Sequence, residues 1–173
     1  DGPVAIRLPE MIGFWVMTLG LYRFVARRSG GLYGCLAMLF PLATGAARYT
    51  TEGRPYGLLL AFSTLALLAW QAVPESGHRR LAILAIAASL AAALGTHYYA
   101  VLLLPALGMA ELVRSVRRRR LDLAVWGAIL LPLSSFLLYL PLIRGARTYA
   151  EHFWARAQWK SLGVAYRFLL DPT

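Results

Sequence analysis

Long apolar runs separated by short gaps rich in arginine dominate this sequence. Apolar residues make up 59% of the 173 residues and charged residues only 15%, which is too little charge to cover the surface of a soluble domain. The runs also lack the amphipathic alternation of water-facing helices or strands. The predicted fold class is therefore all-α, a polytopic transmembrane helix bundle with about six spans. The spans correspond to Leu8–Ala26, Leu32–Ala47, Tyr56–Val73, Leu81–Leu94, Tyr99–Val113 and Leu121–Ile143.

Several of these spans are expected to be short or kinked. A spanning helix needs about 20 residues. The first, third and sixth runs meet that length, whereas the second, fourth and fifth would span only by recruiting loop residues or would stop short of one surface. Proline inside a run kinks a helix and frees backbone carbonyls. Such prolines are Pro41, Pro105, Pro132 and Pro141.

The positions of the arginines predict an orientation. The basic gaps follow the first, third and fifth runs, at Arg27–Arg28, Arg79–Arg80 and Arg114–Arg120. The two intervening connections, Arg48–Pro55 and Gly95–Tyr98, carry little net charge. The positive-inside rule then places the basic loops in the cytoplasm and the other two connections outside. We expect a protein integral to the membrane, in a bacterial setting the inner (plasma) membrane.

The chain divides into a bundle at residues 1–143 and a segment of different character at 144–173. This second segment interleaves aromatic and basic residues, which suits a helix in the membrane interface or a loop over the outer mouth of the bundle. The same alternation could stack on single-stranded nucleic acid. The net charge is +10, but the arginines lie between the apolar runs and form no stripe along one face. This distribution and the topology disfavour a nucleic-acid partner.

Two polar clusters on the predicted outer side are the candidates for chemistry. Glu52 and Arg54 are two residues apart and would not face each other on a helix, but an extended turn before Pro55 could aim both into one cavity. Arginine is suited to bidentate capture of phosphate. The second cluster contains His97 and Tyr98. The alternatives are a solvated loop tip for the first cluster and a structural role for the lone histidine.

Motifs of soluble enzymes are absent, and no cofactor or metal site is evident, although a divalent cation stays an open alternative. Cys35 is the only cysteine, so disulfides within the chain and cysteine-based metal sites are excluded. Gly30 and Gly34 form a GxxxG pattern, which predicts close helix packing.

The order of motifs resembles the membrane glycosyltransferases of the GT-C fold that use polyprenyl-phosphate sugars. Arg7-Leu8-Pro9 opens a span as it does there, and Tyr22 followed by Arg27-Arg28 is similar to the same region. Thr51–Leu59 looks like the family's Glu-Ala-Arg-Pro-Tyr-Ala-Leu pattern, and Thr96–Ala100 resembles its next outer turn. The resemblance covers most of Arg7–Ile143 and is greatest to protein O-mannosyltransferases, aminoarabinose transferases and Rgt-type lipopolysaccharide sugar transferases.

This resemblance implies an enzyme that moves a sugar from a polyprenyl-phosphate donor to a lipid, glycan or protein acceptor on the outer face. The implied partners are that donor, membrane lipids and the remainder of the same chain. The family's catalytic carboxylate lies in an outer loop after the first span, so we expect it upstream of Asp1, in a longer protein. The implied substrate-binding residues are Glu52, Arg54, Tyr56, His97 and Tyr98, with Arg48 as a further phosphate contact.

A transporter or a non-catalytic membrane scaffold is the alternative. Transporters often contain paired broken helices and polar residues near mid-membrane. Here the polar residues cluster at the ends of the runs and no repeat is evident, which favours the enzyme. An acidic pair in an outer loop just before Asp1 would support the enzyme further.

Overall fold

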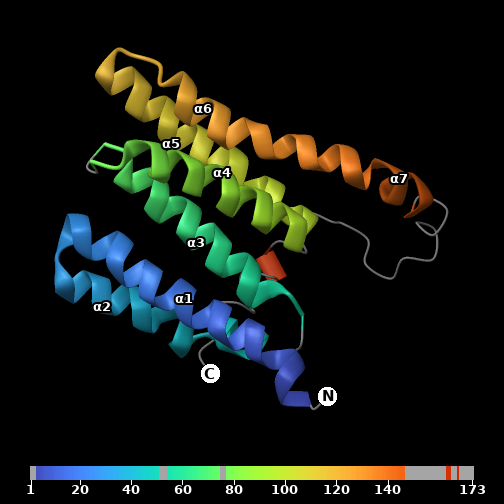
Figure 1. The fold of residues 1–173 in the computed structure, drawn as a ribbon. Helices are drawn as coiled ribbons and strands as arrows, with labels where there is room; N and C mark the ends of the chain where they lie inside the picture. The colour runs from blue at the N-terminus through green and yellow to red at the C-terminus, as the bar shows by residue number, and fades with distance from the viewer. Residues whose placement is uncertain (1–2, 51–53, 75–76, 147–162, 165–166, 168–173) are drawn as a thin grey trace.

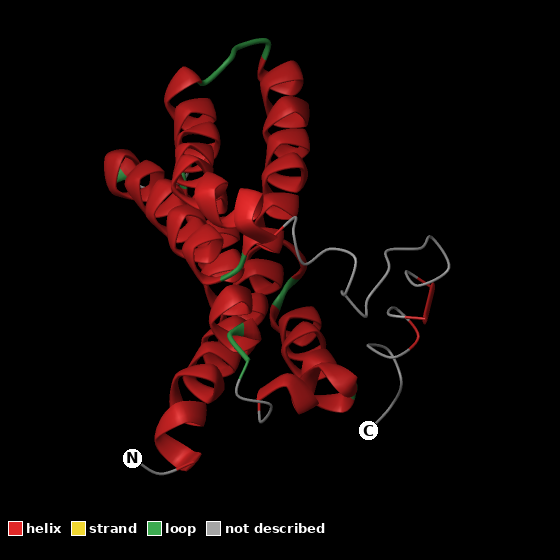
Figure 2. Cartoon of the chain, turned by 90° about the vertical axis from the view of Figure 1, so that its right-hand side faces the viewer, coloured by secondary structure: helices red, strands yellow, loops and turns green. Residues whose placement is uncertain are grey.

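The computed structural model is a bundle of helices (Figure 1). It describes residues 3–50, 54–74, 77–146, 163, 164 and 167, and the segment 144–173 lies mostly outside this range. All regular elements in the described residues are helical (Figure 2), which confirms the all-α fold class.

Six helical segments follow one another along the chain, and each matches one predicted apolar run. Short 3₁₀ turns (η) extend or interrupt three of them. The elements are α1 (Pro3–Ser29), α2 (Gly31–Leu39) with η1 (Phe40–Ala43) and η2 (Gly45–Thr50), α3 (Tyr56–Ala72), α4 (Arg79–Thr96), η3 (Tyr98–Leu102) with α5 (Leu103–Arg118), and α6 (Leu123–Leu130) with η4 (Leu131–Ser135) and α7 (Phe136–Ala146).

Proline explains two of the interruptions. Pro41 lies in η1 and Pro132 in η4, and in both places the α-helix gives way to a 3₁₀ turn because proline lacks the N–H that the helix needs. Pro105 lies in the first turn of α5, where its missing N–H is tolerated, and Pro141 lies inside α7. The predicted irregularities are therefore present at Pro41 and Pro132.

In the part of the chain that the structure describes, three helices are long and apolar enough to cross a membrane: Arg79–Thr96, Tyr98–Arg118 and Leu123–Leu142, of 18, 21 and 20 residues. The third run does not reach the expected length and ends as a 17-residue helix, Tyr56–Ala72. The fourth and fifth runs reach spanning length by recruiting loop residues, which was one of the two expected alternatives. The added residues are Arg79, Arg80, Gly95 and Thr96 in the fourth run, and Tyr98 and Arg114–Arg118 in the fifth. The second run forms a short helix, as expected.

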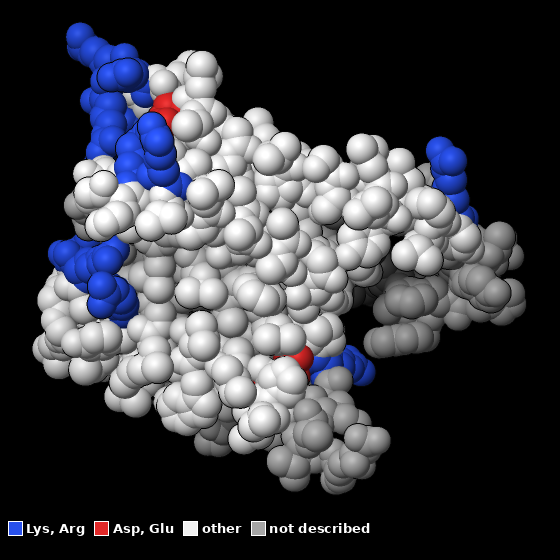
Figure 3. All heavy atoms as spheres, in the orientation of Figure 1, with Lys and Arg blue, Asp and Glu red and all other residues white. Residues whose placement is uncertain are grey.

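The two ends of the bundle differ in composition. The connections α1–α2, α3–α4 and α5–α6 lie together at one end, which we call the arginine end (Figure 1). The space-filling view shows arginine side chains gathered there, with a broad uncharged band beside them and smaller basic groups elsewhere on this face (Figure 3). The start of α3 and the end of α4 lie at the opposite end, which we call the histidine end. This distribution agrees with the predicted alternation of basic loops.

Glycines allow α1 to approach its two neighbours closely. A Cβ at Gly57 in α3 would lie 2.2 Å from the Glu10 carbonyl oxygen of α1, and one at Gly20 would lie 2.3 Å from Thr64 Cγ2. Gly34 packs against Tyr22 and needs the same absence of a side chain. Gly30 has nothing nearby. Its φ of +91° instead allows the turn between α1 and α2, so the GxxxG pattern reflects packing at one glycine only.

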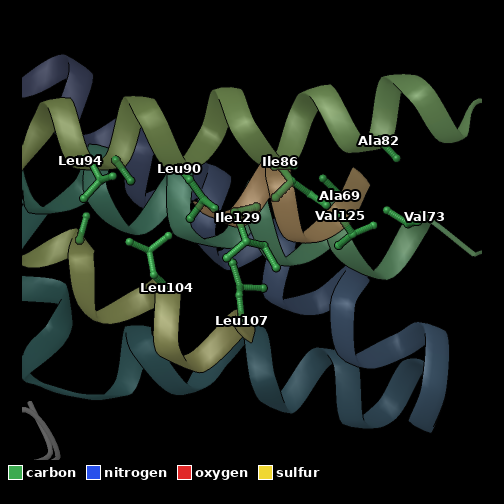
Figure 4. Packing of buried hydrophobic residues seen from close by; sticks show 14 residues of the cluster. Ala69, Val73, Ala82, Ile86, Leu90, Leu94, Leu104, Leu107, Val125 and Ile129 are labelled. Atoms are coloured by element: carbon green, nitrogen blue, oxygen red, sulfur yellow. The ribbon is translucent and has the colours of Figure 1, made fainter. Parts of the chain in front are cut away.

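The hydrophobic core lies among α3, α4, α5 and α6. Ile86 and Leu90 of α4 meet Leu107 of α5 and Ile129 of α6, and all four side chains are buried (Figure 4). Alanines such as Ala66 fill the narrower contacts with α3. This packing fixes the end of α4 relative to the start of α3, which positions the site at the histidine end.

Candidate functional site

A carboxylate from α1 caps the start of α3. Pro55 precedes this helix and offers no side-chain acceptor, so the first N–H groups of α3 need another partner. Glu10 supplies it: its Oε2 accepts hydrogen bonds from the Gly57 N–H at 2.7 Å and the Leu58 N–H at 3.3 Å. Glu10 is only 6% exposed. A buried negative charge at a helix N-terminus is favoured by the helix dipole, so this contact ties α1 to α3.

His97 ends α4 and begins the next turn. Its backbone is extended, at φ −155° and ψ 130°, which stops the helix at Thr96. Its Nδ1 accepts a hydrogen bond from the Tyr99 N–H at 3.2 Å. In the neutral ring the proton then lies on Nε2, which is left as a donor. Tyr139 of α7 donates its hydroxyl to the Gly95 carbonyl at 3.1 Å and so secures the last turn of α4 from another side.

Three tyrosine rings gather around His97, and the four rings form what we call the aromatic cluster: Tyr56, His97, Tyr98 and Tyr99. The His97 ring centroid lies 4.9 Å from that of Tyr98 and 5.1 Å from that of Tyr99, both in stacked geometry. Tyr56, from the start of α3, lies 5.8 Å from His97. Tyr98 and Tyr99 are more than half exposed. The cluster therefore presents aromatic faces and hydroxyl groups to the surroundings.

The structure thus brings together three of the predicted substrate-binding residues, Tyr56, His97 and Tyr98, from two separate connections. Arg54 is close by in the chain and exposed, and its carbonyl accepts the Tyr56 N–H at 2.7 Å. Glu52 lies outside the described residues. Arg48 belongs to η2, which contacts α1 and α3, but its side chain is not described.

Glu10 is the residue at this end that sequence reasoning missed. A single carboxylate inside an apolar run was a signal, because ionisable groups in such runs usually have a partner or a function. Its partner could not be inferred, since the contact joins residues 47 positions apart through backbone N–H groups.

A second buried polar group, also missed, lies nearer the arginine end. Glu111 is 1% exposed and accepts hydrogen bonds from Trp70 Nε1 at 2.8 Å and from the Arg114 guanidinium. Arg114 also donates to the Trp70 carbonyl at 3.0 Å and lies 4.4 Å above the Trp70 ring. Arg114 is therefore mostly buried and paired, whereas Arg117–Arg120, which follow it, are exposed. The available signal in the sequence was that Glu111 and Arg114 lie three residues apart, a spacing at which side chains on a helix can interact.

Among the described residues no group of three or more His, Cys, Asp or Glu side chains converges as a metal site would require. Comparisons with protein-family models, curated proteins and solved structures find no match to this chain. Interpretation of the histidine end therefore rests on its own geometry.

Proposed function

We propose that this chain is part of an integral membrane glycosyltransferase that moves a sugar from a polyprenyl-phosphate donor to a lipid, glycan or protein acceptor on the outer face. The supporting observation is the meeting of Tyr56 with His97 and Tyr98 beside Arg54, at the end of the bundle opposite the basic connections. Three long apolar helices fit a membrane location.

Each group has a role in this proposal. The aromatic faces of the cluster suit the apolar faces of a sugar ring, and the tyrosine hydroxyls and His97 Nε2 suit its hydroxyl groups. Arg54 binds the donor phosphate and stabilises the negative charge that develops as the phosphate leaves, with Arg48 as a second cation. None of the residues described here is assigned the role of the carboxylate that activates the acceptor.

The position of Glu10 limits the places at which the donor phosphate can bind. The N-terminus of a helix is a common phosphate site, because its N–H groups and dipole attract anions. In α3 the Glu10 carboxylate already occupies this position. The donor phosphate must then rely on guanidinium groups, which makes Arg54 the residue to test.

The test is sugar transfer from a polyprenyl-phosphate donor by the full-length protein, with expression and folding checked for each variant. A lost charge-assisted hydrogen bond is worth about 1.5–3 kcal/mol, so Arg54→Ala should lower transfer about tenfold to a hundredfold. Arg54→Lys should restore only part of it, because an ammonium lacks the bidentate geometry.

Arg28→Ala is the matched control. Arg28 is an exposed arginine at the arginine end, so its loss should leave transfer nearly unchanged. If Arg54→Ala transfers sugar as well as the parent, the phosphate site is wrong and Arg54 belongs to an ordinary loop.

A further inference from the structure

Two adjoining hollows lie at the arginine end, away from the aromatic cluster. The first has a volume of about 590 Å³ and lies where α4 begins, α5 ends and α6 begins. It is lined by Arg79, Arg118, Arg120, Leu121, Asp122 and Leu123.

The second hollow follows α5 and has a volume of about 410 Å³. It shares Arg120 and Leu121 with the first, so the two hollows adjoin. Its remaining lining is Leu112, Ser115, Val116 and Arg119. Leu112 and Val116 are 44% and 68% exposed, so an apolar surface leads away from the arginines.

The first hollow has an uncompensated positive charge. Arg79 donates to both carboxylate oxygens of Asp122, at 2.7 and 2.6 Å. Partial burial opposes ionisation of Asp122, but the hydrogen bonds from Arg79 and the Val125 N–H hold its pKa below the usual value, so this pair is neutral overall. Within the described part of the chain, Arg118 and Arg120 form no ion pair. Three arginines against one aspartate leave the lining with a net charge of +2.

A buried polar atom in the second hollow also lacks a partner. Ser115 is 4% exposed, and its Oγ has no hydrogen-bond partner among the described residues. Buried hydroxyl groups are nearly always hydrogen-bonded, so this unpartnered Oγ beside the second hollow is unusual.

We propose that these hollows bind one anionic glycerophospholipid, with its phosphates at Arg118 and Arg120 and an acyl chain along Leu112 and Val116. Basic pockets between helices at the cytoplasmic side of membrane proteins suit such headgroups. The net charge of +2 favours a lipid with two phosphates, such as a diphosphatidylglycerol, over one with a single phosphate. This site goes beyond the sugar transfer proposed above and does not depend on it.

The experiment counts lipids bound to the purified full-length protein by native mass spectrometry in a non-ionic detergent, over a titration with diphosphatidylglycerol. The parent should retain one copy. Arg118→Ala combined with Arg120→Ala should weaken its binding about tenfold or more. The control combines Arg27→Ala with Arg28→Ala, which removes the same charge from two exposed residues at the same end, and should change binding less than about twofold.

Asp122→Asn provides a test in the opposite direction. It frees Arg79 while keeping a side-chain oxygen for the start of α6, so diphosphatidylglycerol should bind more tightly. Equal losses in the two double variants, or no gain in Asp122→Asn, would overturn the site.

Competitors identify the occupant. Phosphatidylcholine and millimolar inorganic phosphate should fail to displace the bound lipid, and phosphatidylglycerol should displace it weakly. Displacement by inorganic phosphate would show an anion site without a lipid groove. Displacement by polyprenyl phosphate at equal concentration would overturn the assignment to a glycerophospholipid.

Discussion

Glu10 and Gly57 lie in two different helices and contact each other twice. The Glu10 carboxylate accepts a hydrogen bond from the Gly57 N–H at 2.7 Å. The Glu10 carbonyl oxygen is so close to Gly57 that it would lie only 2.2 Å from a Cβ added there. The hydrogen bond needs the close approach, and the close approach needs the glycine. Together they fix the start of α3, and with it Arg54 and Tyr56, against α1.

Removal of the Glu10 carboxylate should destabilise the bundle. Glu10→Ala leaves buried N–H groups of α3 without a partner, at a cost of about 1–3 kcal/mol. Glu10→Gln keeps an acceptor oxygen and loses only the attraction of the charge for the helix dipole, about 0.3–1 kcal/mol. Unfolding in mixed micelles with increasing dodecyl sulfate, followed by circular dichroism, measures both. An alanine variant as stable as the parent would contradict the capping role.

A side chain at Gly57 should force α1 and α3 apart. Gly57→Ala places a methyl group against backbone atoms that cannot move independently, and we expect a loss of about 1–3 kcal/mol in the same assay. Gly127→Ala is the matched control, because Gly127 is an exposed residue within α6 with nothing within 4 Å of an added Cβ. There alanine should be neutral or stabilise the helix by up to about 1 kcal/mol. Equal effects at the two glycines would argue against a close contact.

The apolar runs predicted the helices well because each run had to satisfy its own backbone hydrogen bonds. The ends of an apolar run differ from the ends of the helix where polar residues also belong to the helix, as Arg79 and Thr96 do in α4. The sequence predicted irregularities at its prolines, but it could not show that Pro41 and Pro132 would lie in 3₁₀ turns while Pro105 and Pro141 lie in α-helices.

The site was predictable only in part. Local motifs drew attention to Tyr56, His97 and Tyr98, and the alternation of spans placed both connections at one end. The cap from Glu10 and the pairing of Trp70 with Glu111 join distant residues, and only three-dimensional packing creates such contacts. The substrate-binding roles of all these residues, and of Glu52, Arg54 and Arg48, remain predictions.

The buried pair of Glu111 and Arg114 predicts a non-additive response. Arg114→Met leaves the Glu111 carboxylate buried with Trp70 Nε1 as its remaining partner, so we expect a loss of about 3–5 kcal/mol. Arg114→Met combined with Glu111→Met removes both charges and should be more stable than the single variant. Unfolding of both variants in micelles tests this, with Trp70 fluorescence as a local probe. A double variant less stable than Arg114→Met would contradict a dominant cost from the unpaired charge.

The orientation can be tested at the two ends of one helix. Gly77 lies just before α4 and Gly95 lies in its last turn, and both residues are exposed. A Cβ added at either glycine would have no neighbouring atom within 4 Å, so a cysteine fits at each without strain. In a background with Cys35 replaced, Gly95→Cys should react with a membrane-impermeant maleimide in intact cells. Gly77→Cys, beside the basic residues Arg79 and Arg80, should react only after lysis. The reverse pattern would invert the orientation and place the aromatic cluster on the cytoplasmic side, where a glycosyltransferase acting on the outer face could not use it. Labelling of both positions from outside would show that α4 does not cross the membrane.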